Sequence, residues 1–155
     1  MSNLERKKNW PKIYCLHLRN CDPSKCTAIR LQKFSILKII KKISGRLKNA
    51  VVLYPLSHNL LTKNDQNIIK KHGIIVIDCS WKRIFDATTI DLKGFVNDRK
   101  LPPLRAVNSI NYGKWEKLSS AEALAAALFI TNYKDFSKFI LSKFPWGDEF
   151  FRINF

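Results

Sequence analysis

The sequence lacks several features that mark large classes of protein. None of its apolar runs is long enough to span a bilayer, and the polar, basic stretch 1–11 is unlike a secretory signal. Its five glycines form no phosphate-binding loop. Its four cysteines include no pair with the spacing of a zinc knuckle, although His17, Cys21 and Cys26 leave a metal site as the weaker alternative. We therefore expect a cytoplasmic protein with reduced thiols, no membrane segment and no metal.

Acidic residues are also scarce. The chain has 12 Asp and Glu residues against 28 Lys and Arg residues, which gives a net charge of +16. An excess of this size is typical of a domain that binds a polyanion, and nucleic acid is the commonest one. A lysine-rich genome or a solubilising surface would produce the same excess, so charge alone leaves both explanations open.

Hydrophobic patterns predict alternating strands and helices. We expect strands at 13–18, 50–54 and 74–77, and helices at 28–44, 62–71, 121–130 and 134–143. The first of these helices should end at Gly45, whereas 82–100 and 144–155 show no clear period. Strand–helix alternation favours a parallel α/β sheet, in which ligands bind beyond the carboxyl ends of the strands. Asp78 and Trp81 follow the strand at 74–77 and are therefore candidate site residues.

Six segments, in order, resemble one family, the ribosome-biogenesis aminocarboxypropyltransferases of archaea and eukaryotes. They are Asp22-Pro-Ser-Lys-Cys-Thr27, Ile77-Asp-Cys-Ser-Trp81, Arg99-Lys-Leu-Pro-Pro-Leu104, Asn108-Ser-Ile-Asn-Tyr-Gly-Lys114, Leu118-Ser-Ser-Ala-Glu-Ala-Leu-Ala-Ala126 and Phe144-Pro-Trp-Gly-Asp148. The resemblance implies a monomer with a SPOUT-like fold. A parallel-sheet α/β lobe at 1–100 would precede a helical, trefoil-knotted lobe at 101–155 that completes the cofactor site.

The resemblance also implies a reaction. S-adenosylmethionine would donate its 3-amino-3-carboxypropyl group to N3 of a pseudouridine, with or without an N1-methyl group, in small-subunit rRNA or a pre-ribosomal particle, releasing methylthioadenosine. A SPOUT-class rRNA methyltransferase and a non-catalytic rRNA-binding assembly factor are the alternatives. Asp78 and Trp81 are the expected catalytic residues, Asp78 as a base or a partner of the sulfonium and Trp81 as a wall for the methionine chain or a base. A helix cap and a core tryptophan are their structural alternatives.

The remaining site residues follow from the resemblance and from local chemistry. Thr27 is expected at the ribose hydroxyls or as a helix cap, and Ser120 at a helix N-terminus that suits the methionine carboxylate. Glu116 would meet the methionine amine, although the pair Trp115-Glu116 departs from the family pattern, so that only a backbone contact is preserved there. The predicted cofactor set is Thr27, Leu53, Ile77, Asp78, Trp81, Leu101, Leu104, Glu116 and Ser120. The predicted RNA-binding set is Arg19, Lys25, Arg30, Arg99, Lys100 and Arg105.

Overall fold

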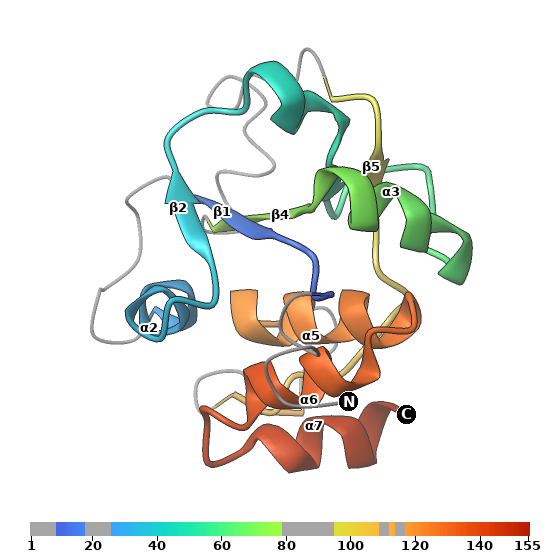
Figure 1. Ribbon diagram of the computed structural model, residues 1–155. Helices are drawn as coiled ribbons and strands as arrows, with labels where there is room; N and C mark the ends of the chain where they lie inside the picture. Colours follow the sequence, from blue (N-terminus) through green and yellow to red (C-terminus); the bar gives the residue numbers. More distant parts are fainter. Residues whose placement is uncertain (1–8, 18–25, 79–94, 109–111, 114–116) are drawn as a thin grey trace.

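A five-stranded parallel sheet forms the centre of the protein in its computed structural model (Figure 1). The structure describes residues 9–17, 26–78, 95–108, 112–113 and 117–155, and of Asp78 only the backbone. The described strands are β1 (Ile13–His17), β2 (Lys38–Ile40), β3 (Val51–Leu53), β4 (Ile74–Asp78) and β5 (Asp98–Arg99), in the order β2-β1-β4-β3-β5. Every pairing between them is parallel. The predicted parallel α/β fold is therefore confirmed.

Most of the described helices lie on one side of this sheet. Figure 1 shows α5 next to the sheet with α6 and α7 stacked beyond it, and α2 beside α5. The helical elements are α2 (Thr27–Lys33), η1 (Gly45–Asn49), η2 (Lys63–Asp65), α3 (Gln66–His72), α5 (Ser120–Ile130), α6 (Lys134–Leu141) and α7 (Gly147–Asn154).

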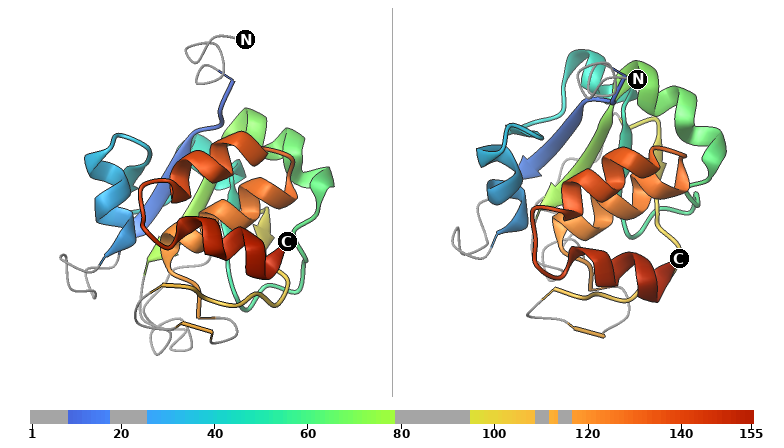
Figure 2. Two further views of the ribbon diagram at one scale, coloured as in Figure 1. Left: turned by 90° about the horizontal axis from the view of Figure 1, so that it is seen from below. Right: turned by 60° about the horizontal axis from the view of Figure 1, so that its bottom comes forward.

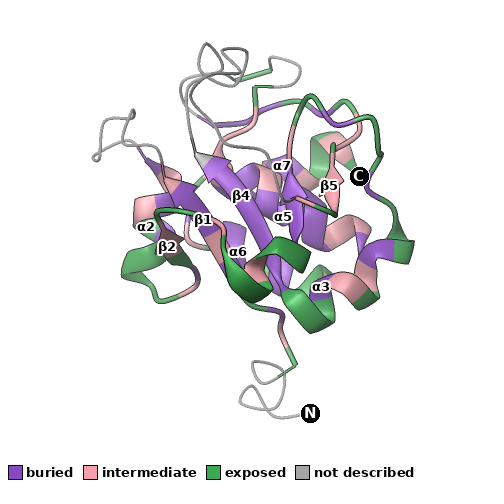
Figure 3. Ribbon diagram, turned by 90° about the horizontal axis from the view of Figure 1, so that it is seen from above, coloured by how far each residue is buried: buried purple, intermediate pink, exposed green. Residues whose placement is uncertain are grey.

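Alternation along the strands divides the core between the two faces of the sheet. On the helical face, Cys15, Leu53 and Val76 belong to a large cluster that includes Leu31 of α2 and Leu124 of α5. On the other face, a smaller cluster gathers Leu16, Ala50, Val52, Ile75 and Ile77. Figure 3 shows the buried central strands with the outer side of α3 exposed. A strand buried on both faces reads as a continuous apolar run, which is why 74–77 was easy to predict.

The helix expected at 28–44 is wrong beyond its first two turns. The α2 helix ends at Lys33, and Ser35 adopts a left-handed backbone with φ of 59°. The Ile36 amide then donates to the Leu31 carbonyl at 3.0 Å, which closes the helix end. The residues that follow include two isoleucines in β2, which pairs with β1, because tertiary pairing outweighs a helical spacing of apolar residues. Gly45 begins η1 rather than ending a helix.

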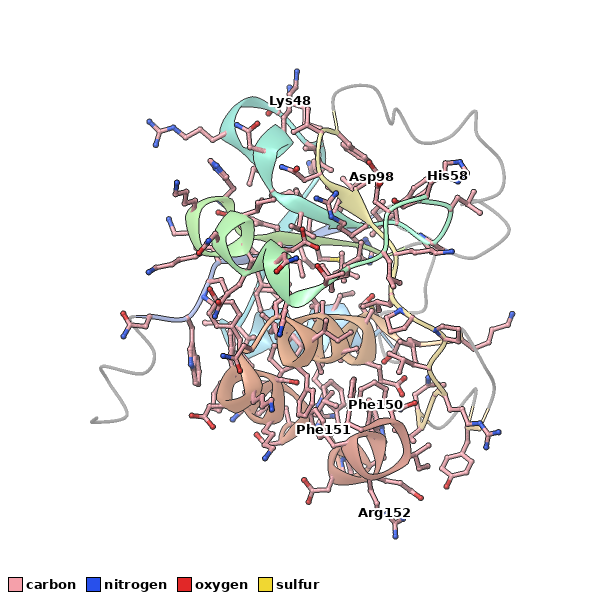
Figure 4. The ribbon with its side chains drawn as sticks, turned by 90° about the vertical axis from the view of Figure 1, so that its right-hand side faces the viewer. Lys48, His58, Asp98, Phe150, Phe151 and Arg152 are labelled. Carbon is pink, nitrogen blue, oxygen red and sulfur yellow. The ribbon has the colours of Figure 1, made fainter. Side chains whose placement is uncertain are left out.

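The C-terminal stretch, for which no period was found, contains the helix α7. The helix spans only eight residues, which is about two turns and too few to show a clear helical period, and only one face of it is buried. Phe150 is fully buried while Arg152 is exposed, and Figure 4 shows Phe150 and Phe151 between α7 and α5 with Arg152 on the outer side. The first residue of α7 is Gly147. A larger residue does not fit there, because its Cβ would clash with the Leu141 carbonyl.

The remaining strands and helices agree more closely with the sequence-based predictions. Strands at β1, β3 and β4 and helices at α5 and α6 are confirmed within a few residues, and the helix expected at 62–71 appears as η2 followed by α3. In the stretch thought to be loop-rich, 79–94 lies outside the described residues and β5 is the short strand at its end. The division into lobes at residue 100 stays a prediction.

Candidate functional site

The carboxyl edge of the sheet brings together the ends of three adjacent strands. His17 at the end of β1 pairs with Asp78 at the end of β4, and Leu53 at the end of β3 pairs with Val76 of β4. Parallel strands place all their carboxyl ends at one edge, where α/β proteins bind ligands. The register therefore places the backbone of Asp78 at this edge, as predicted.

Thr27 joins the N-termini of two helices near this edge. Its Oγ1 accepts a hydrogen bond from the Ala121 amide at 3.1 Å. The N-cap residue of α2 is Cys26, whose side chain makes no capping hydrogen bond. Thr27 instead caps the first turn of α5, at Ala121, 94 residues further along the chain. Thr27 therefore acts as a helix cap, as the structural alternative predicted, but it caps α5 and not α2. The contact places Thr27 beside Ser120, the first residue of α5.

Glu122 holds the chain before α5 against that helix. Its Oε1 accepts from the Ser119 amide at 3.0 Å, from the Ser119 hydroxyl at 2.9 Å and from Asn108 Nδ2 at 2.6 Å. Its Oε2 accepts from the Val107 amide at 2.7 Å, and the side chain is fully buried. The Ser119–Glu122 capping box was predicted and is confirmed. The contacts to Val107 and Asn108 were missed, because a capping motif signals only the local bonds.

The predicted apolar residues divide between the two faces of the sheet. Leu53 and Leu104 are each 6% exposed and belong to the cluster on the helical face, and Leu101 packs against it. Ile77 is 7% exposed but belongs to the cluster on the opposite face. Leu53 and Leu104 therefore share the core of the helical face with α5, while the Ile77 side chain points to the opposite face.

Several predicted site residues lie outside the described part of the chain. These are Trp81, Glu116, Arg19 and Lys25, together with the side chain of Asp78. The catalytic assignment of Asp78 and Trp81 therefore stays a prediction.

Arg99 already has partners within the protein. Its Nε lies 3.1 Å from Oδ1 of Asp65, and its Nη1 donates to the Asp98 carbonyl at 2.9 Å. Asp65 also closes the capping box of η2 through Thr62. The Arg99 side chain is only 17% exposed, so its main observed role is to tie β5 to the start of α3.

The other described members of the basic set are exposed. Arg30, Lys100 and Arg105 all lie on the surface. The Arg30 guanidinium carbon lies 5.3 Å from the centre of the Phe144 ring, and the Arg105 backbone exchanges two hydrogen bonds with the Asn154 side chain. Arg30, Lys100 and Arg105 are thus exposed while Arg99 is largely buried, and the RNA-binding role of all four stays a prediction.

The pKa values of two tyrosines are raised. The Tyr112 hydroxyl donates to Oε1 of Glu149 at 2.7 Å, and this hydrogen bond raises the pKa of Tyr112 above its ordinary value of 10.0. Burial raises the pKa of Tyr133. In the described part of the chain, no group of His, Cys, Asp and Glu side chains is arranged to hold a metal. Nor does any helix in that part have the length and apolar character needed to cross a membrane.

The protein has the architecture of the ligand-binding α/β proteins. It has a parallel sheet, and two helix N-termini are joined at the carboxyl edge of that sheet. Comparisons with known proteins narrow this class. The family model described as "Ribosome biogenesis protein, C-terminal" matches residues 51–155, from β3 to the last residue. The 16S rRNA aminocarboxypropyltransferase of Methanosphaera stadtmanae is 40% identical over 143 residues, which cover 92% of this chain and 83% of that protein. The one of Thermoplasma acidophilum is 42% identical over 142 residues, covering 92% and 84%.

A solved structure agrees with these relatives. The SAM-dependent rRNA:acp-transferase Tsr3 from Vulcanisaeta distributa matches with a TM-score of 0.86 at 37% identity, covering 92% of this chain and 78% of that one. The chain belongs to the family of 16S rRNA aminocarboxypropyltransferases and is a transferase. The resemblance predicted from the sequence is thus confirmed.

Proposed function

We propose that this protein transfers the 3-amino-3-carboxypropyl group of S-adenosylmethionine to N3 of a pseudouridine, with or without an N1-methyl group, in small-subunit rRNA, with methylthioadenosine as the second product. Family membership supports the reaction class. The structural observation that supports it best is the hydrogen bond from Ala121 to Thr27, because it fixes the N-terminus of α5 beside the start of α2.

The described residues suit the donor. The positive end of the α5 dipole and the Ser120 hydroxyl would receive the methionine carboxylate, since helix N-termini favour anions. Leu53 and Leu104, in the core cluster of the helical face, and Leu101, which packs against that cluster, would line the apolar part of the adenosine site. Thr27 would approach the ribose. Glu122 keeps this end of α5 in place through its bonds to Val107 and Asn108.

The transfer itself needs alignment rather than a covalent intermediate. N3 of the base attacks the γ-carbon of the methionine chain, the carbon–sulfur bond breaks, and the N3 proton must leave. Asp78, at the end of β4, is proposed to take that proton or to face the sulfonium, and Trp81 to align the methionine chain or the base. Alignment also decides which carbon reacts, because the same donor supports methyl transfer when its methyl group faces the acceptor.

The finer features of the fold are part of the same proposal. They are the two lobes meeting at residue 100, a trefoil knot in the second lobe, a monomeric state and a cytoplasmic location. Sedimentation of the purified protein at several concentrations tests the monomer, since a concentration-dependent mass would contradict it.

The decisive experiment compares two labels in the donor. The protein is incubated with small-subunit rRNA and S-adenosylmethionine labelled either in the carboxyl carbon or in the methyl group. We expect carboxyl label in the RNA, methyl label left in methylthioadenosine, and no dependence on added metal after treatment with a chelator. Methyl label in the RNA together with S-adenosylhomocysteine would instead establish a methyltransferase. RNA binding without binding of the donor would establish an assembly factor.

A further inference from the structure

Aromatic rings and cations contact one another where α2 meets the end of α6. We call this region the aromatic strip and define it by Arg30, Phe34, Phe139, Lys143 and Phe144, of which the Phe144 ring is buried. The Lys143 ammonium lies 5.0 Å from the centre of the Phe34 ring and 4.5 Å from that of Phe139. The Arg30 guanidinium lies 5.3 Å from the centre of the Phe144 ring. Helices far apart in sequence thus hold two cations against three rings.

Phe34 is the most exposed ring of the aromatic strip. It is 49% exposed at the end of α2, whereas Leu31, one turn earlier, is fully buried. Apolar burial stabilises a fold in proportion to area, so a ring of this size left half in water contributes less than it could to the core. A ring fixed beside a cation and open to solvent is the kind of surface on which nucleic-acid bases stack.

The charge that α2 brings to the aromatic strip is positive, whereas α6 carries one carboxylate, Asp135, in its first turn. The chain contains no acidic residue between Thr27 and Asn64, a stretch that includes all of α2 and β2. Lys33 in the last turn of α2 and Lys138 in the last turn of α6 add to the charge of the strip. Phosphates that approach this surface therefore meet cations without nearby carboxylates on α2.

The distance from the candidate site suits a single strand of RNA. Phe34 follows Thr27 by seven residues along α2, and a helical rise of 1.5 Å per residue separates them by roughly 10 Å along the helix axis. That length corresponds to about three stacked nucleotides at 3.4 Å each. A strand whose target base enters the site at Thr27 therefore reaches Phe34 within a few nucleotides.

We propose that the aromatic strip binds unpaired nucleotides beside the target base, with one base stacked on Phe34 and phosphates neutralised by Arg30 and Lys143. This inference rests on the proposed function, since it names the form of RNA that the same site receives. Single-stranded RNA fits better than a duplex, because the bases of a duplex are stacked on each other and cannot cover a protein ring.

The chain offers matched control positions on another surface. Phe155 is 46% exposed, close to the 49% of Phe34. The Lys134 ammonium lies 5.1 Å from the centre of the Phe129 ring, close to the 5.0 Å between Lys143 and the Phe34 ring. Figure 2 shows α2 and the C-terminus on opposite sides of the molecule. Phe155→Ala and Lys134→Gln therefore make the same chemical changes away from the aromatic strip.

The test measures binding of a labelled single-stranded RNA of about 12 nucleotides, within the site sizes usual for single strands. Phe34→Ala should weaken binding by about 5- to 150-fold, the range that loss of one stacked base gives. Phe34→Tyr should restore binding, and Phe155→Ala should leave it unchanged. Lys143→Gln should lower the slope of log affinity against log salt by roughly 0.7, the value for one phosphate on a single strand, whereas Lys134→Gln should not.

Three outcomes would overturn the inference. They are equal affinity of Phe34→Ala and Phe155→Ala, an equal loss of affinity for duplex RNA in Phe34→Ala, and no binding of the single strand by the unaltered protein. The two-label transfer assay on the unaltered protein tests the proposed function independently of this inference. If carboxyl label is transferred but Phe34→Ala binds RNA normally, the inference about the aromatic strip is wrong and the proposed reaction stands.

Discussion

Glu122→Gln tests whether one buried side chain holds the candidate site together. The carboxylate accepts hydrogen bonds from Val107, Asn108 and Ser119 and is fully buried. Glutamine has nearly the same shape but only one acceptor oxygen. If that oxygen keeps the Asn108 and Ser119 donors, the new amide nitrogen faces the Val107 amide, and a donor then opposes a donor.

The expected loss follows from this geometry. A hydrogen bond to a charged group contributes about 1.5–3 kcal/mol, and a buried donor left without an acceptor costs a similar amount. We therefore expect Glu122→Gln to lower the free energy of unfolding by about 2–4 kcal/mol. For a chain of 155 residues, each kcal/mol shifts Tm by roughly 2–4 °C, so Tm should fall by about 4–16 °C.

Urea denaturation of Glu122→Gln measures this loss directly. The midpoint should fall while the m-value stays the same, since the extent of unfolding is unchanged. Affinity for S-adenosylmethionine, measured by calorimetry well below the lowered Tm, should fall as well, because the N-terminus of α5 is no longer fixed to residues 107–108. Glu149→Gln is the control, since its carboxylate is bound only at the surface, by Tyr112 and Arg152. An unchanged urea midpoint for Glu122→Gln would refute this reasoning.

Three further predictions concern the site and the surface. Asp78→Asn should keep the fold and slow single-turnover transfer by roughly 10²–10⁴, the usual contribution of an acid–base group; normal transfer with stability lowered by about 1 kcal/mol would identify a cap instead. Thr27→Val should lower stability by about 1–3 kcal/mol in urea and weaken donor binding, because the Ala121 amide loses its acceptor, and Thr27→Ser should restore both. Tyr112 should ionise above pH 10.0 by ultraviolet titration against Tyr112→Phe, and Glu149→Gln should bring its pKa down toward 10.0. Because the folded pKa is raised, the stabilisation from this hydrogen bond is present below pH 10.0 and lost as pH rises through the folded value. An unshifted tyrosine would contradict the observed hydrogen bond.

Local patterns predicted three of the five described strands, β1, β3 and β4, and the helices α3, α5 and α6, for simple reasons. The run 74–77 is β-branched throughout and buried on both faces, so its pattern signals a central strand without further information. The capping box at Ser119 and Glu122 fixed the start of α5 because both of its hydrogen bonds are local. The failure at 34–45 arose because β2 forms by pairing with β1, a distant element. The failure at 144–155 arose because α7 is only eight residues long, too short to show a clear helical period in the sequence.

The candidate site divides in the same way. The sequence alone determined the excess of positive charge, the family, and the placement of Asp78 at the end of a strand, since each depends on residue type and order. Only the tertiary structure decided that Thr27 caps α5, that Glu122 binds residues 107 and 108, that the side chains of Leu53 and Ile77 occupy opposite faces, and that Asp65 holds Arg99. Each of these depends on which distant groups lie close in space, because hydrogen bonds act over about 3 Å and apolar contacts over about 4 Å.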